Sequence, residues 1–320
     1  MTEVVLVTGA AGFIGSHLSE RLVRLGYRVV GLDNFDDCYP ATIKWANIRA
    51  LQGEDGFRME QGDIRDRTLV SRIFAENGVS LVVHLAARAG VRPSLEQPLL
   101  YQDVNIGGTV NLLEVSRQFG ARKFVFASSS SVYGLNGKAP FTEESAVNYP
   151  ISPYAASKAA GELFCRSYSH LYNLPIVVLR LFTVYGPRQR PEMAIHRFVR
   201  MIDRGEEITL FGDGTTSRDY TYVDDVIDGF QAALGYRGEA FAIFNLGSGR
   251  SVGLNHLVAL IEQALNKKAR IRYQEAAPGD VSLTLADISK AKAALGYQPK
   301  VAIEEGVPLF VEWYLGNKGG

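Results

Sequence analysis

Short apolar runs alternate with longer amphipathic runs through the first half of the chain. The first apolar run, VVLVT at residues 4–8, is rich in β-branched residues and shows no alternation of polar and apolar positions. Such a run is typical of a strand that is buried on both faces of a parallel sheet. The amphipathic run HLSERLVRLG follows closely and has the apolar spacing of a helix that covers such a sheet.

The same alternation predicts further strands at YRVVGLD, FRMEQGD, SLVVHLAA, KFVFAS and PIVVLRLF. Helical runs separate them, among them DVNIGGTVNLLEVSRQFG and PYAASKAAGELFCRSY. Strands that alternate with helices predict an α/β fold with a Rossmann-type, doubly wound parallel sheet.

The pattern changes after Phe182, where TVYGPRQRP interrupts the alternation. We expect a helix from about Pro191, a strand at ITLFGDG and a helix at VDDVIDGFQAAL. The run AFAIFNLGSG predicts a seventh strand of the main sheet, followed by its own helix. The predicted domains are a main domain at 1–182 with 239–267, and a smaller α/β lobe at 183–238 and 268–320.

Composition narrows the class of protein. Hydrophobic residues make up 47% of the 320-residue chain and charged residues 21%, as in an ordinary globular protein. A net charge of +0 favours neither nucleic acid nor an anionic membrane, and no apolar run approaches the about 18–20 residues that span a bilayer. Cys38 and Cys165 have no metal-ligand spacing. With no signal-peptide pattern at the N-terminus, we expect a cytoplasmic protein without a metal.

A glycine-rich turn joins the first strand to the first helix. It reads GAAGFIG at residues 9–15, and glycines there allow a tight turn and the close approach of a diphosphate to the helix N-terminus. The second strand ends at Asp33, whose carboxylate can accept hydrogen bonds from an adenosine ribose and repels a 2′-phosphate. NAD is therefore the predicted cofactor. A simpler role for Asp33, as the first residue of a loop, is the alternative.

Later strand ends supply further candidate cofactor contacts. Asp63 and Ile64 follow the third strand, where an adenine amino group is read, and small residues follow the fourth strand. Asn105 is a candidate for holding the active-site helix or a water, with simple helix N-terminal bonding as the alternative. The full predicted cofactor set is Gly9, Gly12, Phe13, Ile14, Gly15, Asp33, Asn34, Asp63, Ile64, Leu85, Ala86, Ala87, Asn105, Tyr154, Lys158 and Phe182.

Tyr154 and Lys158 are the candidate acid–base pair. They stand four residues apart in YAASK, so on a helix both side chains lie on one face. An ammonium near a phenol lowers the phenol pKa from about 10 toward the range where proton transfer is efficient. A tyrosine and a lysine with this spacing but no other motif usually lie on a helix surface. Here the nucleotide-binding turn upstream favours acid–base chemistry on a hydroxyl.

Five motifs in order, TGAAGFIG, SSSSVYG, YAASK, LRLFTVYGPR and GDGTTSRDYTYVDD, together resemble the extended short-chain dehydrogenase/reductase family of NAD-dependent nucleotide-sugar epimerases and dehydratases. The resemblance covers essentially the whole chain. Within the family, FASSSSVYGLN and FTVYGPRQRPEMA are most similar to the UDP-glucuronate 4-epimerases.

The resemblance implies a tightly held NAD that oxidises a UDP-sugar at C4, rotation of the 4-keto sugar, and return of the hydride to the other face. Tyr154 is then the general base and acid, Lys158 lowers its pKa and binds the nicotinamide ribose, and Ser129 hydrogen-bonds the C4 oxygen. Arg218 pairs with the diphosphate, and Arg190 is a second anion contact unless either is a surface charge. The implied substrate set is Ser129, Ser130, Ser131, Tyr154, Thr183, Arg190, Arg218 and Asp280.

The resemblance also implies a homodimer, formed by the helices at 105–119 and 155–172. Their apolar content is equally explained by packing on the sheet. No metal enters this chemistry.

Residues at three single positions distinguish between the related activities of the family. Ser130 and Ser131 stand where the family's 4,6-dehydratases have an Asp-Glu pair, and Ser131 stands where its decarboxylases have glutamate. UDP-glucose 4-epimerases usually have Asn at Thr183. These three hydroxyls suit a C6 carboxylate, although the serine run is also explained by a strand-end turn. The alternatives are a UDP-glucose or UDP-N-acetylglucosamine 4-epimerase, a UDP-glucuronate decarboxylase, and a non-catalytic NAD-sensing protein.

Overall fold

A computed structural model describes residues 3–135, 138–275 and 282–318. Its centre is a seven-stranded sheet in the order β10-β6-β5-β4-β1-β2-β3, in which all neighbours pair in parallel. The strands are β1 (Val4–Thr8), β2 (Arg28–Asp33), β3 (Phe57–Gln61), β4 (Leu81–His84), β5 (Lys123–Ser129), β6 (Ile176–Leu181) and β10 (Phe241–Leu246). The predicted doubly wound sheet and its seventh strand are confirmed.

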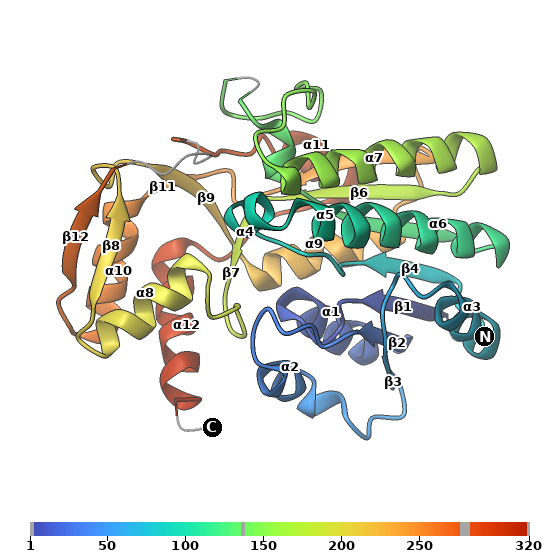
Figure 1. The fold of residues 1–320 in the computed structure, drawn as a ribbon, viewed down its shortest axis with the longest axis horizontal. Helices are drawn as coiled ribbons and strands as arrows, with labels where there is room; N and C mark the ends of the chain where they lie inside the picture. Colours follow the sequence, from blue (N-terminus) through green and yellow to red (C-terminus); the bar gives the residue numbers. More distant parts are fainter. Residues whose placement is uncertain (1–2, 136–137, 276–281, 319–320) are drawn as a thin grey trace.

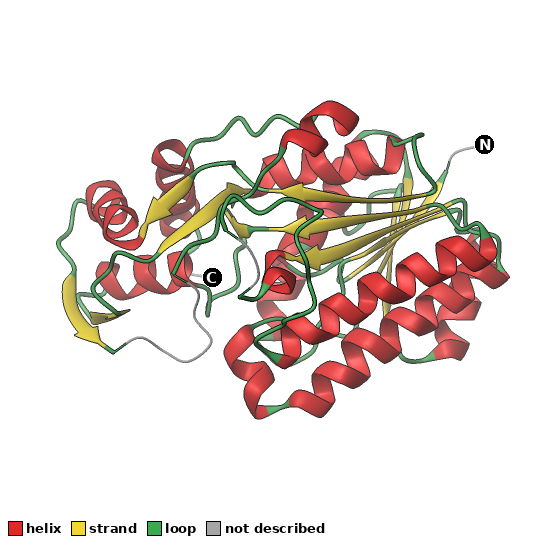
Figure 2. Ribbon diagram, turned by 90° about the horizontal axis from the view of Figure 1, so that it is seen from above, coloured by secondary structure: helices red, strands yellow, loops and turns green. Residues whose placement is uncertain are grey.

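Helices cover both faces of this sheet, as Figure 2 shows. Successive side chains of β1 enter opposite cores: Val5 and Val7 pack in one, Leu6 in the other. The face of Val5 is covered by α1 (Phe13–Arg24) and α9 (Val223–Gly235), and the face of Leu6 by α3 (Arg67–Asn77), α6 (Gly108–Gln118) and α7 (Pro153–Tyr172). A strand buried on both faces needs apolar residues at every position, which explains the unbroken VVLVT run.

The smaller lobe lies at the carboxyl ends of the main strands, on the left in Figure 1. It contains a three-stranded sheet, β11-β9-β7, and a two-stranded sheet, β12-β8. The elements that follow β6 in the chain, apart from α9 and β10, are β7 (Thr183–Tyr185), α8 (Ala194–Asp203), β8 (Glu207–Phe211), β9 (Ser217–Tyr222), β11 (Ser251–Gly253), α10 (Leu254–Leu265), β12 (Arg270–Gln274), α11 (Ser289–Leu295) and α12 (Ile303–Gly316); of these, α11 packs on β10 and α9 of the main body. The strand predicted at ITLFGDG is confirmed as β8.

Two features of local structure were not predicted. No strand was assigned to Thr183–Tyr185 or Ser217–Tyr222, but these segments pair in parallel as β7 and β9. This pairing joins segments far apart in the chain, so local patterns do not reveal it. The helix predicted through Asn105 is also interrupted: α5 (Pro98–Tyr101) leads into a π-helical turn, η2 (Gln102–Gly107), before α6 begins.

Short elements complete the described fold: α2 (Ala41–Asn47), η1 (Arg49–Leu51), α4 (Val91–Glu96) and the 3₁₀ turn η3 (Ser130–Tyr133). Across the ranges that the structure describes, every helix is too short or too polar to cross a membrane.

Candidate active site

The glycine-rich turn lies at the carboxyl end of β1, between β4 and β2 in the sheet. Gly9 has φ of 71° and donates its N–H to Leu32 O over 2.7 Å. A Cβ on Gly15 would lie 2.0 Å from Gly9 O, so only glycine lets the helix pack this closely on the turn. Helix α1 has no side-chain cap among the described residues, which leaves its first N–H groups to bind an anion.

Asp33 lies at the end of β2 beside this turn and is 7% exposed. Its two oxygens accept hydrogen bonds from Ala11 N over 3.2 Å and from Phe35 N over 2.8 Å. Lys44 Nζ lies 3.5 Å from the carboxylate. Each carboxylate oxygen accepts more than one bond, so Asp33 retains capacity for ribose hydroxyls. The turn, the uncapped helix and Asp33 together fit a dinucleotide.

Asp63 is more fully engaged within the protein than the sequence suggests. Its oxygens accept hydrogen bonds from Asn34 Nδ2 over 3.0 Å and from Arg65 N, Nε and Nη2 over 2.8–2.9 Å. The bond to Arg65 lowers the pKa of Asp63 to about 2. A carboxylate has about four acceptor positions, so the predicted contact of Asp63 with an adenine amino group requires one of these bonds to be exchanged. The neighbouring Ile64 is buried.

The loop after β4 approaches the turn from the other side. A Cβ on Gly9 would lie 2.9 Å from Ala86 N, and Ala86 N donates to Thr8 Oγ1 over 3.2 Å. His84 is buried between the hydroxyls of two threonines, and burial lowers its pKa to about 3. It is a packed, neutral histidine.

Asn105, on the π-helical turn, links this loop to α7. Its Oδ1 accepts from Arg88 N over 2.8 Å, and its Nδ2 donates to Arg88 O and to Ser157 Oγ, both over 2.9 Å. Because Ser157 belongs to α7, Asn105 contacts the active-site helix. Phe182, also in the predicted cofactor set, is 3% exposed, and its ring centroid lies 6.3 Å from that of Tyr133.

Helix α7 begins where its sequence indicates. The Ser152 side chain accepts a hydrogen bond from Ala155 N over 3.1 Å, and Pro153 occupies the first helical turn. This start places Tyr154 in the first turn and Lys158 in the next. Lys158 is buried, and its Nζ donates to Ala127 O on β5 over 2.8 Å.

The pKa values of the pair differ from the prediction. Burial raises the pKa of Tyr154, while the hydrogen bond with Ser129 and the charge of Arg190 lower it by less. Burial lowers the pKa of Lys158 to about 8, opposed by the charges of Cys165 and Glu162. The predicted lowering of the Tyr154 pKa by Lys158 is therefore corrected. Desolvation of the phenol is the larger effect.

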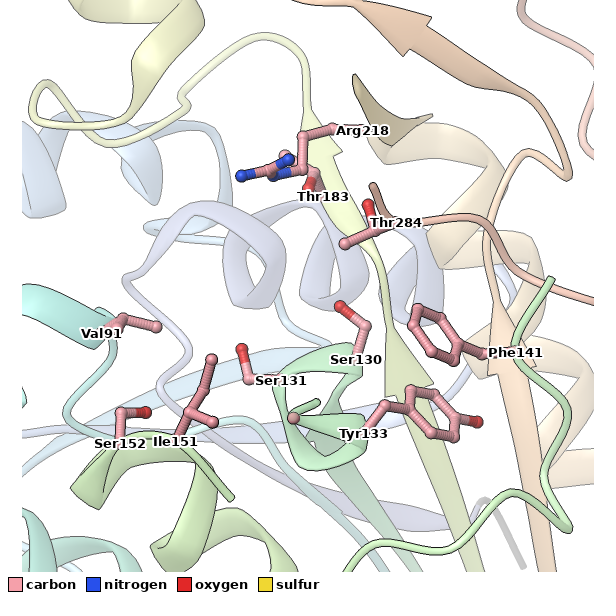
Figure 3. Close-up of a pocket in the computed structure, with 11 residues that line it drawn as sticks. Val91, Ser130, Ser131, Tyr133, Phe141, Ile151, Ser152, Thr183, Arg218 and Thr284 are labelled. Atoms are coloured by element: carbon pink, nitrogen blue, oxygen red, sulfur yellow. The ribbon is translucent and has the colours of Figure 1, made fainter. Parts of the chain in front are cut away.

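A pocket opens beside the serine run (Figure 3). It brings together Ser130 and Ser131 from η3, Thr183 from β7 and Arg218 from β9. In Figure 3 the serine hydroxyls point toward the side of the pocket on which Thr183 and Arg218 lie. The pocket lies between the two lobes, and its other lining residues are Val91, Tyr133, Gly134, Phe141, Ile151, Ser152 and Thr284.

The remaining predicted substrate residues lie at different places. Arg218 Nη1 donates to Ser217 O over 3.0 Å, while Arg190 pairs with Glu192 over 3.2 Å and does not line the pocket. Arg190 is nevertheless close enough to Tyr154 for its charge to lower the phenol pKa. Asp280 lies outside the described residues. The described ranges contain no group of three or more His, Cys, Asp or Glu placed to hold a metal ion.

Thr284 is a pocket residue that the sequence did not indicate. Its Oγ1 accepts from Asp219 N over 3.1 Å, and its N–H donates to Ser217 O over 3.1 Å. These bonds hold a late segment of the chain against β9, next to Arg218. A single threonine in an irregular stretch carries no local signal, so only tertiary structure identifies it.

Comparison with known proteins agrees with this architecture. The family model for GDP-mannose 4,6 dehydratase matches residues 6–309. A UDP-glucuronate 4-epimerase of Thermodesulfobacterium geofontis (strain OPF15) is 45% identical over 309 residues, which are 96% of this chain and 95% of the relative. UDP-glucuronate 4-epimerase 3 of Arabidopsis thaliana is 44% identical over 333 residues, which cover 99% of this chain and 77% of the relative.

Solved structures show the same similarity. The UDP-glucuronic acid 4-epimerase of Bacillus cereus, crystallised with UDP-glucuronic acid and NAD, superposes with a TM-score of 0.93 at 38% identity, covering 98% of this chain and 99% of that one. The UDP-glucose 4-epimerase of Thermotoga maritima, with UDP-glucose, gives 0.90 at 36% identity, with the same coverage. From its motifs, its fold and these matches, the chain belongs to the NAD-dependent epimerase/dehydratase family of extended short-chain dehydrogenases/reductases.

Proposed function

We propose that the protein catalyses NAD-dependent 4-epimerisation of a UDP-sugar and interconverts UDP-glucuronate and UDP-galacturonate. The observation that carries the proposal is the pocket in which Ser130, Ser131 and Thr183 gather three hydroxyls beside Arg218. The assignment is supported by relatives that are UDP-glucuronate 4-epimerases.

In this mechanism Tyr154 takes the proton of the C4 hydroxyl and later returns it. Ser129, which hydrogen-bonds Tyr154, also contacts the C4 oxygen and orients it toward the phenol. Lys158 supplies a positive charge one helical turn away and binds the nicotinamide ribose. NAD, when bound, accepts the hydride from C4 and gives it back to the opposite face of the rotated keto sugar.

The three hydroxyls have a second task. Oxidation of glucuronate at C4 creates a β-keto acid. This acid loses CO2 once the bond between C5 and the carboxylate carbon aligns with the π system of the C4 carbonyl. Hydrogen bonds from Ser130, Ser131 and Thr183 hold the carboxylate away from that alignment. Arg218 neutralises the diphosphate, since a guanidinium fork suits phosphate oxygens. Arg190 is a second anion contact that approaches the site on its Tyr154 side.

We further propose that NAD binds to 1–182 with 239–267 and the sugar nucleotide to 183–238 and 268–320. This division follows the sequence; in the structure, β11 pairs with β9 and α10 packs on α8 and α12, whereas α9 packs on the main sheet. A homodimer through the helices at 105–119 and 155–172 is supported by exposed apolar side chains on α7, where Leu163 is 67% and Leu171 61% exposed. A cytoplasmic location is consistent with free cysteines at Cys38 and Cys165.

The decisive experiment incubates purified protein, without added cofactor, with UDP-glucuronate and separately with UDP-glucose. We expect UDP-galacturonate from the first substrate only. Product from UDP-glucose alone would favour the second candidate, a neutral-hexose epimerase like the T. maritima protein. UDP-pentose with CO2 as the main product of UDP-glucuronate would identify a decarboxylase.

A further inference from the structure

A buried carboxylate lies one turn beyond Lys158 on the same face of α7. Tyr154, Lys158 and Glu162 recur at every fourth position, so their side chains follow one another along the helix. Glu162 is 5% exposed and has no part in the proton transfers described above. A charged side chain is rarely buried without polar partners. The partners of the Glu162 carboxylate therefore indicate its role.

The partners of Glu162 tie α7 to two strands of the sheet. Ser128 Oγ on β5 donates to Glu162 Oε1 over 2.5 Å. Arg180 on β6 donates through Nε to Oε1 over 3.0 Å and through Nη2 to Oε2 over 2.7 Å, a two-pronged ion pair. Ser128 directly precedes Ser129, so this contact holds the base of the serine run.

Two residues that line the pocket are held through Arg180. Its Nη1 donates to the Tyr133 hydroxyl over 3.1 Å, and that hydroxyl donates to Asn245 Oδ1 over 2.6 Å. Asn245 Nδ2 in turn donates to Phe141 O over 2.9 Å. The rings of Tyr133 and Phe141 stack at 4.8 Å and both line the pocket. In Figure 3 the Tyr133 hydroxyl points away from Ser131 and Ile151.

We propose that Glu162, Arg180 and Tyr133 are positioning residues that fix the serine run and the stacked Tyr133 and Phe141 rings relative to the helix that carries Tyr154, and so keep the uronate carboxylate from the alignment that releases CO2. This inference rests on the proposed function. Glu162 and Arg180 do not line the pocket, and Tyr133 lines it with its ring while its hydroxyl bonds to Arg180 and Asn245.

The side reaction that they suppress begins from the 4-keto uronate. The bond between C5 and the carboxylate carbon breaks, its electron pair moves into the C4 carbonyl to form an enolate, and CO2 leaves. The enolate then takes up a proton from water at C5. The hydride returns from the reduced cofactor to C4 while Tyr154 returns its proton to the C4 oxygen, which gives a pentose. These steps use only the substrate, one proton from water, and the hydride and proton of the proposed reaction.

A purely structural role is the competing explanation. A buried ion pair is weak evidence for stability, since well-packed apolar residues often replace such a pair without loss. What distinguishes this pair is its two connections: Ser128, which directly precedes the serine run, and Tyr133, which lines the pocket. Loosening either connection therefore changes the freedom of the pocket walls without removing a group that contacts the sugar.

The test uses two small changes, Ser128→Ala and Tyr133→Phe, which each delete one hydroxyl of the network. The matched controls are Ser169→Ala, on α7 like Glu162, and Tyr185→Phe, another buried tyrosine. Their hydroxyls bond to Ala240 O and Ala302 O, outside the network. Each purified protein is incubated with UDP-glucuronate, and the ratio of UDP-pentose to UDP-galacturonate is measured together with kcat and KM.

We expect the ratio to rise by about tenfold in both network variants, the factor that corresponds to one lost hydrogen bond, and to stay at the wild-type value in both controls. An unchanged ratio in Ser128→Ala and Tyr133→Phe, or an equal rise in the controls, overturns the inference. Failure of the proposed function is separate, because the wild-type protein itself would then form no UDP-galacturonate from UDP-glucuronate.

Discussion

Lys158 Nζ donates a 2.8 Å hydrogen bond to the carbonyl oxygen of Ala127. This contact joins the helix that carries Tyr154 to the strand that ends in the serine run, so the two halves of the acid–base site are fixed relative to each other. It also places the ammonium in a buried position, where its pKa falls to about 8 because of desolvation.

Removal of the Tyr154 hydroxyl should stop turnover and leave cofactor binding intact. We expect Tyr154→Phe to lower kcat for UDP-glucuronate by at least about a hundredfold, the usual contribution of a general acid–base group. The NAD retained through purification should match that of the wild type. Tyr168→Phe changes a tyrosine of the same helix whose hydroxyl bonds to Glu114 on α6, and this variant should keep full activity. Full activity of Tyr154→Phe contradicts the mechanism.

The depressed pKa of Lys158 predicts a dependence of stability on pH. Between about pH 8 and its ordinary value of 10.5, the unfolded chain keeps a proton that the folded protein has lost. The unfolded state then binds more protons, so the free energy of unfolding rises with pH by up to about 3 kcal/mol from this group. Below pH 8 both states are protonated and this contribution is constant.

The measurement compares urea unfolding of the wild type and Lys158→Met at pH 7, 8 and 10, chosen around that window. The difference between the two proteins should be equal at pH 7 and 8 and should shift in favour of the wild type at pH 10. Parallel curves throughout would show that burial does not depress the Lys158 pKa.

Gly15 should be essential for the dinucleotide-binding turn. In Gly15→Ala the new methyl group would meet Gly9 O at 2.0 Å, so the turn must move away from α1. We expect the NAD content of the purified protein to fall at least about tenfold, the loss that corresponds to one or two weakened backbone contacts. Gly235→Ala, where a Cβ meets nothing within 4 Å, is the matched control. Equal NAD content in the two variants would contradict the assignment.

Thr183 should contribute to the choice of substrate. Thr183→Val removes one of the three hydroxyls while keeping the side-chain shape, and we expect kcat/KM for UDP-glucuronate to fall about tenfold or more, because a hydrogen bond to a charged group is lost. Thr183→Ser retains the hydroxyl and should retain most of the activity. If both variants behave alike, the hydroxyl does not contact the carboxylate.

Several features of the site arise only from contacts between distant segments. The pairing of β7 with β9 brings Thr183 and Arg218 to one pocket, and Thr284 joins them through bonds to Asp219 and Ser217. The hydrogen bond from Asn34 to Asp63 likewise depends on loops that meet in space. Local residue patterns carry no information on such meetings.

By itself, the sequence determined the seven-stranded parallel sheet, the glycine turn at its centre and the Tyr154–Lys158 spacing on α7. These follow from short-range rules: apolar runs make buried strands, glycine permits a close turn, and four residues make one helical turn. Tertiary structure alone decided the sign of the Tyr154 pKa shift, the pocket walls and the buried network behind them. Burial and electrostatic interaction depend on distances between residues far apart in the chain, and only the folded arrangement sets those distances.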